Sequence, residues 1–277
     1  MIKSILFWLL AMLTAPFFSA VILKVKAFFG GKKGPPILIN YYTLFKLFQK
    51  GSVYSTSTTY VFKMGPMISL ATAVTALLFL PIAGQPPMFS WHGDIILVLY
   101  LLGLGRFFTI AAAMDTASPF EGMGAAREAY FPIFCEATLF LTLILFFMLS
   151  GELRLSAYFF GGEPLHLWRA AGAPLLFVVI ALFIVLLTEN TRVPVDDPAT
   201  HLELTMIHEV MVLDHSGPDL GMIELGSCIK LFFYATIVSR LIWPYDMGNA
   251  FIDGALFAVA MLAVYGAVGV TESVMAR

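Results

Sequence analysis

The sequence predicts an all-α membrane protein, and three observations lead to this fold class. Hydrophobic residues make up 60% of the 277 residues and charged residues 12%, about half of the roughly 25% that soluble domains carry. Several apolar runs approach the roughly 20 residues that a helix needs to cross a bilayer. Segments of about ten residues with alternating polarity, which would indicate a β-barrel, are absent. We therefore treat residues 1–277 as a single transmembrane domain of about seven helices, at about 4–23, 66–84, 94–114, 131–150, 173–189, 222–243 and 250–270.

The first predicted span resembles a signal peptide, but we expect it to stay in the protein. Lys3 precedes the apolar run, and small residues lie near Ser19 and Ala20. The run is longer than the apolar core of a signal peptide, and Lys24 and Lys26 follow it. These features favour an uncleaved transmembrane helix.

The loop after this span is rich in lysine, which predicts the orientation of the chain. The loop at 85–93, by contrast, contains no lysine or arginine. Because positive charge collects on the cytoplasmic side of a membrane, we place the loops at about 24–65, 115–130 and 190–221 in the cytoplasm. The polar segments then share one face of the protein. The lysines in or next to the first loop are Lys24, Lys26, Lys32, Lys33, Lys46, Lys50 and Lys63.

Residues 40–50 of this loop, NYYTLFKLFQK, predict a short amphipathic helix that lies in the membrane interface. Four apolar residues recur at helical spacing, and two lysines occupy other positions of the helix. Two interpretations remain open, namely a helix that contacts only lipid and a lid over an opening into the protein. The apolar residues are Tyr41, Leu44, Phe45 and Phe48.

Three charged residues lie inside predicted spans, where ionised side chains are costly and are candidates for function. Arg106 lies in the third span, Glu136 in the fourth and Lys230 in the sixth. One axis through the bundle could hold all three, either as a proton relay or as static pairs that fix helix packing. Snorkelling or headgroup contact explains three further acids near span ends. These acids are Glu189, Glu224 and Asp253.

The segment 115–128, DTASPFEGMGAARE, predicts a polar loop that leads into a helix starting near Ala125. Its glycines do not form a phosphate-binding loop, because no strand precedes them and no Gly-Lys-Ser or Gly-Lys-Thr sequence follows. Glu128 and Glu136 are eight residues apart, a rise of about 12 Å along one helix. A water molecule or a third group would be needed to connect them.

Residues 194–221, PVDDPATHLELTMIHEVMVLDHSGPDLG, form a charged island that holds six carboxylates and three histidines. Thr200 could cap a helix that runs to about Leu213. Histidines with a pKa near 6.5 among carboxylates suit proton handling. The island is therefore a candidate docking surface and the mouth of a polar path, or else a solvated polar loop.

The island does not carry a recognisable metal or hydrolase site. His208 and the following glutamate resemble the start of an HExxH zinc motif, but Val212 replaces the second histidine. His201 and His208 would lie about 10.5 Å apart along a helix, too far to bind one ion. Ser216 is adjacent to His215, and adjacent residues cannot adopt the geometry of a catalytic triad. We predict no metal site and no catalytic residue in this chain.

Cysteine usage argues against an iron–sulfur cluster, and the net charge does not indicate a nucleic-acid partner. Cys135 and Cys228 are far apart, and no CxxC pair or set of four cysteines exists to hold an iron–sulfur cluster. The two thiols are expected to be small buried hydrophobic groups. A formal charge of −2 gives no indication of a nucleic-acid partner.

Three motifs resemble a known family. These are KGPPILINYYTLFKLFQKGSVYS (33–55), RFFTIAAAMDTASPFEGMGAARE (106–128) and PVDDPATHLELTMIHEVMVLDHSGPDL (194–220). They are similar to the membrane-anchor subunit of group 4 membrane-bound nickel–iron hydrogenases, of the formate hydrogenlyase and hydrogenase-4 types. That protein is the counterpart of the H subunit of respiratory complex I. The resemblance covers the chain from end to end, although the complex I relatives usually have eight spans.

The resemblance implies a non-redox, non-catalytic subunit of an oxidoreductase complex in a prokaryotic cytoplasmic membrane. Such a protein holds no cofactor, whereas its partners carry the nickel–iron (NiFe) centre and the 4Fe–4S clusters. The implied partners are the hydrogenase large and small subunits, a ferredoxin-like iron–sulfur subunit and antiporter-like membrane subunits. The chain would dock the soluble arm and couple its electron transfer to the translocation of protons or sodium ions.

The resemblance and the charge pattern together give two groups of candidate residues. The candidates for a proton path or for coupling are Arg106, Asp115, Glu128, Glu136, Glu203, Glu209, Asp214 and Lys230. The candidates for the docking surface are Glu121, Arg127, Asp196, Asp197, His201, His208 and Asp219.

Two other functions remain open at this point. In a complex I-like quinone oxidoreductase, the island and the helix at 40–50 would form a quinone chamber. A stand-alone ion transporter usually shows internal repeats and spans broken at matching positions, and we find no such repeat.

Overall fold

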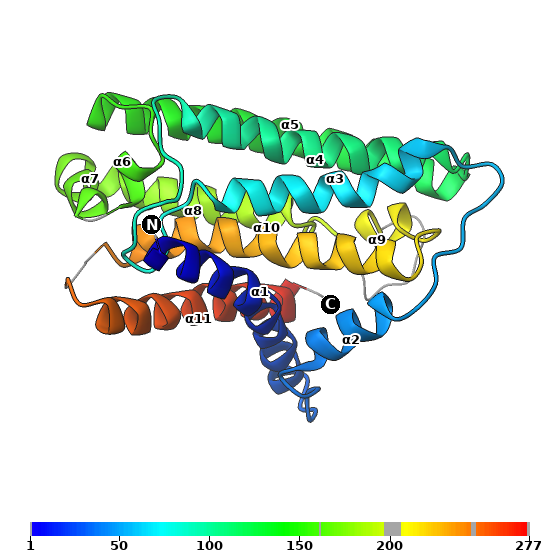
Figure 1. Cartoon of the computed structure of the whole chain (residues 1–277). Helices are drawn as coiled ribbons and strands as arrows, with labels where there is room; N and C mark the ends of the chain where they lie inside the picture. The colour runs from blue at the N-terminus through cyan, green and yellow to red at the C-terminus, as the bar shows by residue number, and fades with distance from the viewer. Residues whose placement is uncertain (1, 161, 197–205, 245–247, 276–277) are drawn as a thin grey trace.

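The computed structural model describes residues 2–160, 162–196, 206–244 and 248–275, and every regular element in those ranges is a helix. The helices run largely along a common direction and form one bundle (Figure 1). They are α1 (Ile2–Phe29), α2 (Ile39–Phe48), α3 (Tyr60–Leu77), α4 (Asp94–Asp115), α5 (Pro119–Ser150), α6 (Ser156–Phe159), α7 (Glu163–Ala171), α8 (Ala173–Glu189), α9 (His208–Met211), α10 (Pro218–Ile242) and α11 (Ala250–Met275).

The prediction of an all-α membrane protein is confirmed. Six helices are long and apolar enough to cross a membrane, namely α1, α3, α4, α5, α10 and α11. The seventh predicted span corresponds to α7 and α8, which are bent by 119° relative to each other and count as one span only if they are taken together. The bend lies at Gly172, whose φ of 55° is readily adopted by glycine.

Two spans begin well before their predicted starts, one of them at a capping residue and the other at a proline. α3 begins at Tyr60 rather than near residue 66, because the Thr59 side chain accepts a hydrogen bond from the Val61 amide and caps the helix. α5 begins at Pro119, since the fixed φ of proline suits the first helical position. The predicted loop at 115–130 is therefore wrong, as only residues 116–118 lie between α4 and α5.

α10 is the central helix of the bundle and lies among α1, α3, α8 and α11 (Figure 1). Most of its residues are buried, including nearly all of those between Ile229 and Leu241. Next to it, α3 and α4 approach closely at two glycines. A Cβ atom added to Gly65 would lie 2.8 Å from the Cβ of Ala112, and one added to Gly105 would lie 2.4 Å from the Oγ1 of Thr72.

The polar segments gather at one end of the bundle, as the lysine pattern predicts (Figure 1). α2, the residues 49–59, the α4–α5 turn, α9 and the start of α10 all lie there. α2 matches the helix predicted at 40–50 and buries none of its side chains. The assignment of this end to the cytoplasm stays a prediction.

The helix predicted from Thr200 to Leu213 is wrong in the part that the structure describes. Only the four residues of α9 are helical, whereas Met206 is non-helical and residues 212–214 form a turn. The carboxylate of Asp196 accepts hydrogen bonds from the amides of Ile207 (3.0 Å) and His208 (2.9 Å) and so starts a short helix at this point. The candidates Asp197, His201 and Glu203 lie outside the described residues.

Candidate functional site

The candidate site is a network of charged side chains with Glu189 at its centre. Glu189 is the last residue of α8, and its side chain is fully buried. The Nη2 atom of Arg106 on α4 lies 2.6 Å from its carboxylate, and the Nζ atom of Lys230 on α10 lies 3.1 Å from it. Lys230 also donates a hydrogen bond to the backbone carbonyl of Glu189. One carboxylate thus joins three helices inside the bundle.

Arg106 extends the network to α5, because its Nη1 atom lies 3.0 Å from the Oε1 atom of Glu136. The three in-span charges that the sequence singled out are therefore linked in one chain of ion pairs through Glu189. Glu189, which connects them, was explained from the sequence as a residue near a span end. The signal that could have identified it is helix length, since the 17 residues of α8 rise only about 26 Å and leave Glu189 within the depth of the hydrocarbon core.

Glu128 completes the network without joining its ion pairs. It is buried on α5 and lines a small cavity of about 60 Å³ together with Arg106, Glu189, Lys230 and His208. A cavity of this size has room for a few water molecules, and its lining offers the polar partners that water needs. Two cations and two carboxylates thus line one polar cavity, and Glu136 is connected to them through its ion pair with Arg106.

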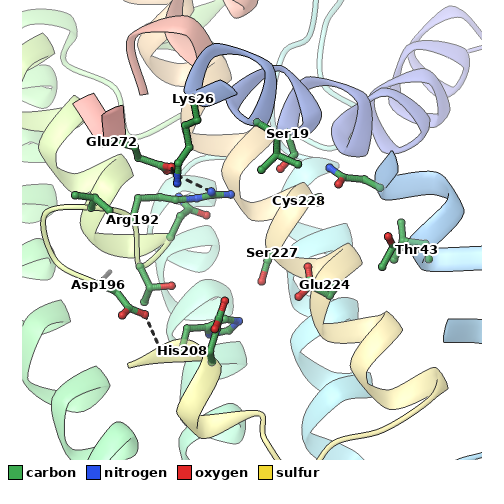
Figure 2. Close-up of a pocket in the computed structure, with 17 residues that line it drawn as sticks. Ser19, Lys26, Thr43, Arg192, Asp196, His208, Glu224, Ser227, Cys228 and Glu272 are labelled. Carbon is green, nitrogen blue, oxygen red and sulfur yellow. Dashed lines mark hydrogen bonds and ion pairs between the residues drawn. The ribbon is translucent and has the colours of Figure 1, made fainter. Parts of the chain in front are cut away.

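A second, larger cavity of about 330 Å³ also has His208 in its lining (Figure 2). It is lined from α1, α2, α10, α11 and the chain that links α8 to α9. Glu272 lies between Lys26 and Arg192 in Figure 2, at 2.9 Å and 3.3 Å, and is almost fully buried. Glu224 of α10 also lines this cavity. Charged groups therefore line both cavities, and His208 contributes to both.

α9 is held in place between the two cavities by α5. A Cβ atom added to Gly124 of α5 would lie 2.9 Å from the carbonyl oxygen of Ile207 and 3.0 Å from the Cγ atom of Met211. Burial, together with the positive charges of Lys230 and Arg192, lowers the pKa of His208 to about 4. His208 is therefore a neutral imidazole at pH 7.

Two coupling candidates make local contacts at the polar end of the bundle. Asp115 accepts hydrogen bonds from the Thr59 amide (2.6 Å) and hydroxyl (2.9 Å), which fixes the start of α3. The amide of Asp214, whose side chain is exposed, donates a hydrogen bond of 3.0 Å to Glu121. A third candidate, Glu209, is exposed and lines the larger cavity.

Three of the five docking candidates that the structure describes are buried, which differs from the surface position that we expected. Glu121, Asp196 and Asp219 are at most 6% exposed, and the first two hold the segment around α9 through backbone amides. Arg127, which is half-buried, donates a hydrogen bond of 3.3 Å to the carbonyl of Met206. These side chains shape the polar end of the bundle, and its role in docking stays a prediction.

Metal-ligating groups do not cluster in the described part of the chain, where no group of three or more His, Cys, Asp or Glu residues could hold an ion. Cys135 and Cys228 are both buried with free thiols, on α5 and α10.

Comparison with known proteins places this chain in a family. Hydrogenase-4 component C of Escherichia coli is 25% identical over 97% of this chain and 85% of its own length, and formate hydrogenlyase subunit 4 of the same organism is 25% identical over 90% and 80%. The H subunit of the NADH-quinone oxidoreductase of Sulfurimonas denitrificans is 26% identical over 79% and 69%.

A solved structure has the same fold. It is a chain of the membrane-bound sulfane sulfur reductase, an archaeal respiratory membrane complex, with a TM-score of 0.80 and 22% identity over 99% of this chain and 89% of that chain. The relatives support a membrane subunit of a complex I-like or hydrogenase complex. The NADH dehydrogenase family profile matches residues 2–277, and the chain belongs to that family.

Proposed function

We propose that this chain couples electron transfer in a docked, soluble hydrogenase arm to ion translocation by adjoining membrane subunits. The observation that carries the proposal is the ion-paired chain Glu136–Arg106–Glu189–Lys230, which crosses from α5 to α10 beside a polar cavity. Inside a membrane, such charges tend to mark ion or proton paths. The polar end of the bundle, which lies beside this network, is the docking surface in this proposal.

The proposal assigns the redox chemistry to the partners. The nickel–iron centre and the iron–sulfur clusters would lie in the hydrogenase large and small subunits and in a ferredoxin-like subunit. This chain would contribute charged side chains that change protonation or pairing when the docked arm is reduced. The antiporter-like subunits would then move protons or sodium ions.

The proposal is tested by separating turnover from translocation in the native complex. Glu136→Gln keeps the shape of the side chain and removes its charge at a half-exposed position. We expect the rate of ion translocation in sealed vesicles to fall roughly tenfold relative to hydrogen evolution, because loss of the negative charge weakens the pairing with Arg106 by about 1.5 kcal/mol. Glu209→Gln is expected to act in the same direction.

The matched control is Glu163→Gln, because Glu163 is an exposed acid on α7, at the opposite end of the bundle. It should leave both turnover and translocation unchanged. Full turnover together with full translocation in both Glu136→Gln and Glu209→Gln would contradict the coupling role.

A second candidate function follows from the larger cavity. A quinone-chamber subunit of a complex I-like oxidoreductase needs a cavity of several hundred Å³ next to the docked arm, and about 330 Å³ lies between α1, α2 and α10. Purification of the complex in mild detergent distinguishes the two functions. A co-purifying nickel–iron subunit that evolves hydrogen from reduced viologen supports the first, whereas bound quinone without nickel supports the second.

A further inference from the structure

The face formed by α4 and α5 leaves a carboxylate half-exposed in the middle of a transmembrane helix. Glu136 lies 17 residues from the start of α5 and 14 residues from its end, about 25 Å and 21 Å along the axis. Its side chain is 54% exposed, whereas the side chain of its partner Arg106 is 10% exposed. An exposed acid at this depth would face the hydrocarbon core of the membrane.

The carboxylate lies in an apolar groove of about 390 Å³ between α4 and α5, with Tyr234 of α10 also in its lining. Tyr100, Phe107 and Phe140 line the groove and are all exposed. The groove is open at Gly103, where an added Cβ atom would meet nothing within 4 Å. It is therefore a long apolar depression with one charged pair at its floor.

The pair with Arg106 does not satisfy Glu136. Arg106 is the only hydrogen-bond partner of Glu136 that we find in the described part of the chain, and it also binds the carboxylate of Glu189. The network as a whole has the two cations Arg106 and Lys230 against three carboxylates. A charged side chain at mid-membrane needs a partner or water, and lipid tails offer no hydrogen-bond donor.

We propose that the α4–α5 groove binds a transmembrane helix of another subunit, which places an N–H or O–H donor side chain level with Glu136. This interface rests on the proposed function only in that the chain works inside a multi-subunit membrane complex. Polar side chains that bond across helices are a recognised source of association in membranes, where apolar surface alone gives no preference over lipid. The carboxylate of Glu136 thus requires a hydrogen-bond donor on the helix that occupies the groove.

A second copy of this chain fits the groove poorly. A twofold contact through the groove would bring the two copies of Glu136 towards each other. Like charges that face each other at close range in a medium of low dielectric constant repel strongly. The occupant is therefore a different chain.

Site-specific photo-crosslinking in the native membrane complex tests the groove directly. A photoreactive amino acid replaces Phe107 or Tyr100 in the groove, or Val259, which is 64% exposed on α11 at the far side of the bundle (Figure 1). We expect both groove positions to give an adduct with another membrane subunit, at a clearly higher yield than the control. Adducts with lipid alone, or with a second copy of this chain, would overturn the proposal.

Further variants distinguish the contribution of the hydrogen bond to Glu136 from that of apolar packing in the groove. Glu136→Leu should reduce the neighbouring subunit retained in mild detergent by roughly threefold to twentyfold, the range that one interhelical hydrogen bond gives, and Glu136→Gln should reduce it less. Gly103→Leu, which fills the groove and leaves Glu136 in place, should abolish the adducts. If Glu136→Leu retained the neighbouring subunit as well as the unchanged protein does, the proposed donor side chain would be ruled out. These measurements do not depend on ion translocation. The interface proposal can therefore fail while the coupling proposal holds, and the coupling proposal can fail while the interface proposal holds.

Discussion

At the scale of single residues, two histidines of the polar end differ in their surroundings but share one property. The ring of His215 stacks on Phe62 at a centroid distance of 3.9 Å and an interplanar angle of 7°. Burial lowers the pKa of His215 to about 4, against the partial opposition of the charges on Asp219 and Asp214. Within the described residues, its Nδ1 atom has no hydrogen-bond partner. Both His215 and His208 are therefore neutral in the folded protein.

This state of His215 makes the stability of the protein sensitive to acid. An unfolded chain binds a proton on histidine near pH 6.5, whereas the folded protein resists protonation until about pH 4. The stabilising contribution of the neutral ring is complete above pH 6.5 and is lost as the pH falls from 6.5 to 4, by roughly 3 kcal/mol in total.

His215→Phe keeps the stacked ring and cannot be protonated, so we expect a flatter dependence of Tm on pH between 6.5 and 4. Thermal unfolding in detergent across this range measures the effect. His208 retains its own pH dependence and sets the residual slope. A slope equal to that of the unchanged protein would show that His215 is not protonated on unfolding in this range.

Glu189 is expected to be the single most sensitive position for stability. Glu189→Leu leaves Arg106 and Lys230 close together without their shared carboxylate, and removal of one partner from a buried pair costs about 3–5 kcal/mol. Glu189→Gln keeps two polar atoms and should cost less. Urea unfolding in mild micelles measures the free energy of unfolding of both variants. An equal loss of stability in the two variants would contradict the prediction.

At the scale of elements, α5 and α9 depend on one glycine. Gly124→Ala would press a methyl group against the carbonyl of Ile207 and displace α9, at a cost of about 1–3 kcal/mol. Gly122 lies on the same helix with nothing within 4 Å of an added Cβ atom, so Gly122→Ala should be neutral or stabilising by about 1 kcal/mol. Comparison of Tm for the two variants tests this, and an equal response would mean that α9 does not rest on Gly124.

The sequence predicts which helices exist far better than it predicts where each helix begins and ends. The apolar runs predicted the spans, because length and hydropathy are local properties. The start of α3 combines the local cap at Thr59 with a contact between Thr59 and Asp115, which are 56 residues apart, and no local pattern contains that second contact. The same limit applies to the site, since Arg106, Glu136 and Lys230 stood out as charges within apolar runs, whereas Glu189 gained its place from the bend before α8.

At the scale of the whole molecule, one ion cluster joins segments that are far apart in the sequence. Glu272 near the end of α11 binds Lys26 of α1 and Arg192 of the α8–α9 link. It connects the first helix, the last helix and the wall of the larger cavity. The bundle therefore closes around that cavity partly through a single carboxylate.

Glu272→Gln should destabilise the protein more than Lys26→Gln does. The first variant leaves two cations without their partner at a carboxylate that is 2% exposed, whereas the second removes a lysine that is 31% exposed and keeps the pair with Arg192. We expect a difference of about 1–3 kcal/mol in the free energy of unfolding, measured by denaturant titration in detergent. The reverse order would contradict this assignment.

His208 belongs to a thin layer of uncharged side chains that lies between the two cavities. Among the described residues, four line both cavities, namely Asn190, Thr191, His208 and Ser227. A layer one side chain thick thus separates the larger cavity from the buried charge network. While the imidazole is neutral, this layer holds no charge of its own, and the field of Glu189, Arg106 and Lys230 stays confined to a low-dielectric interior.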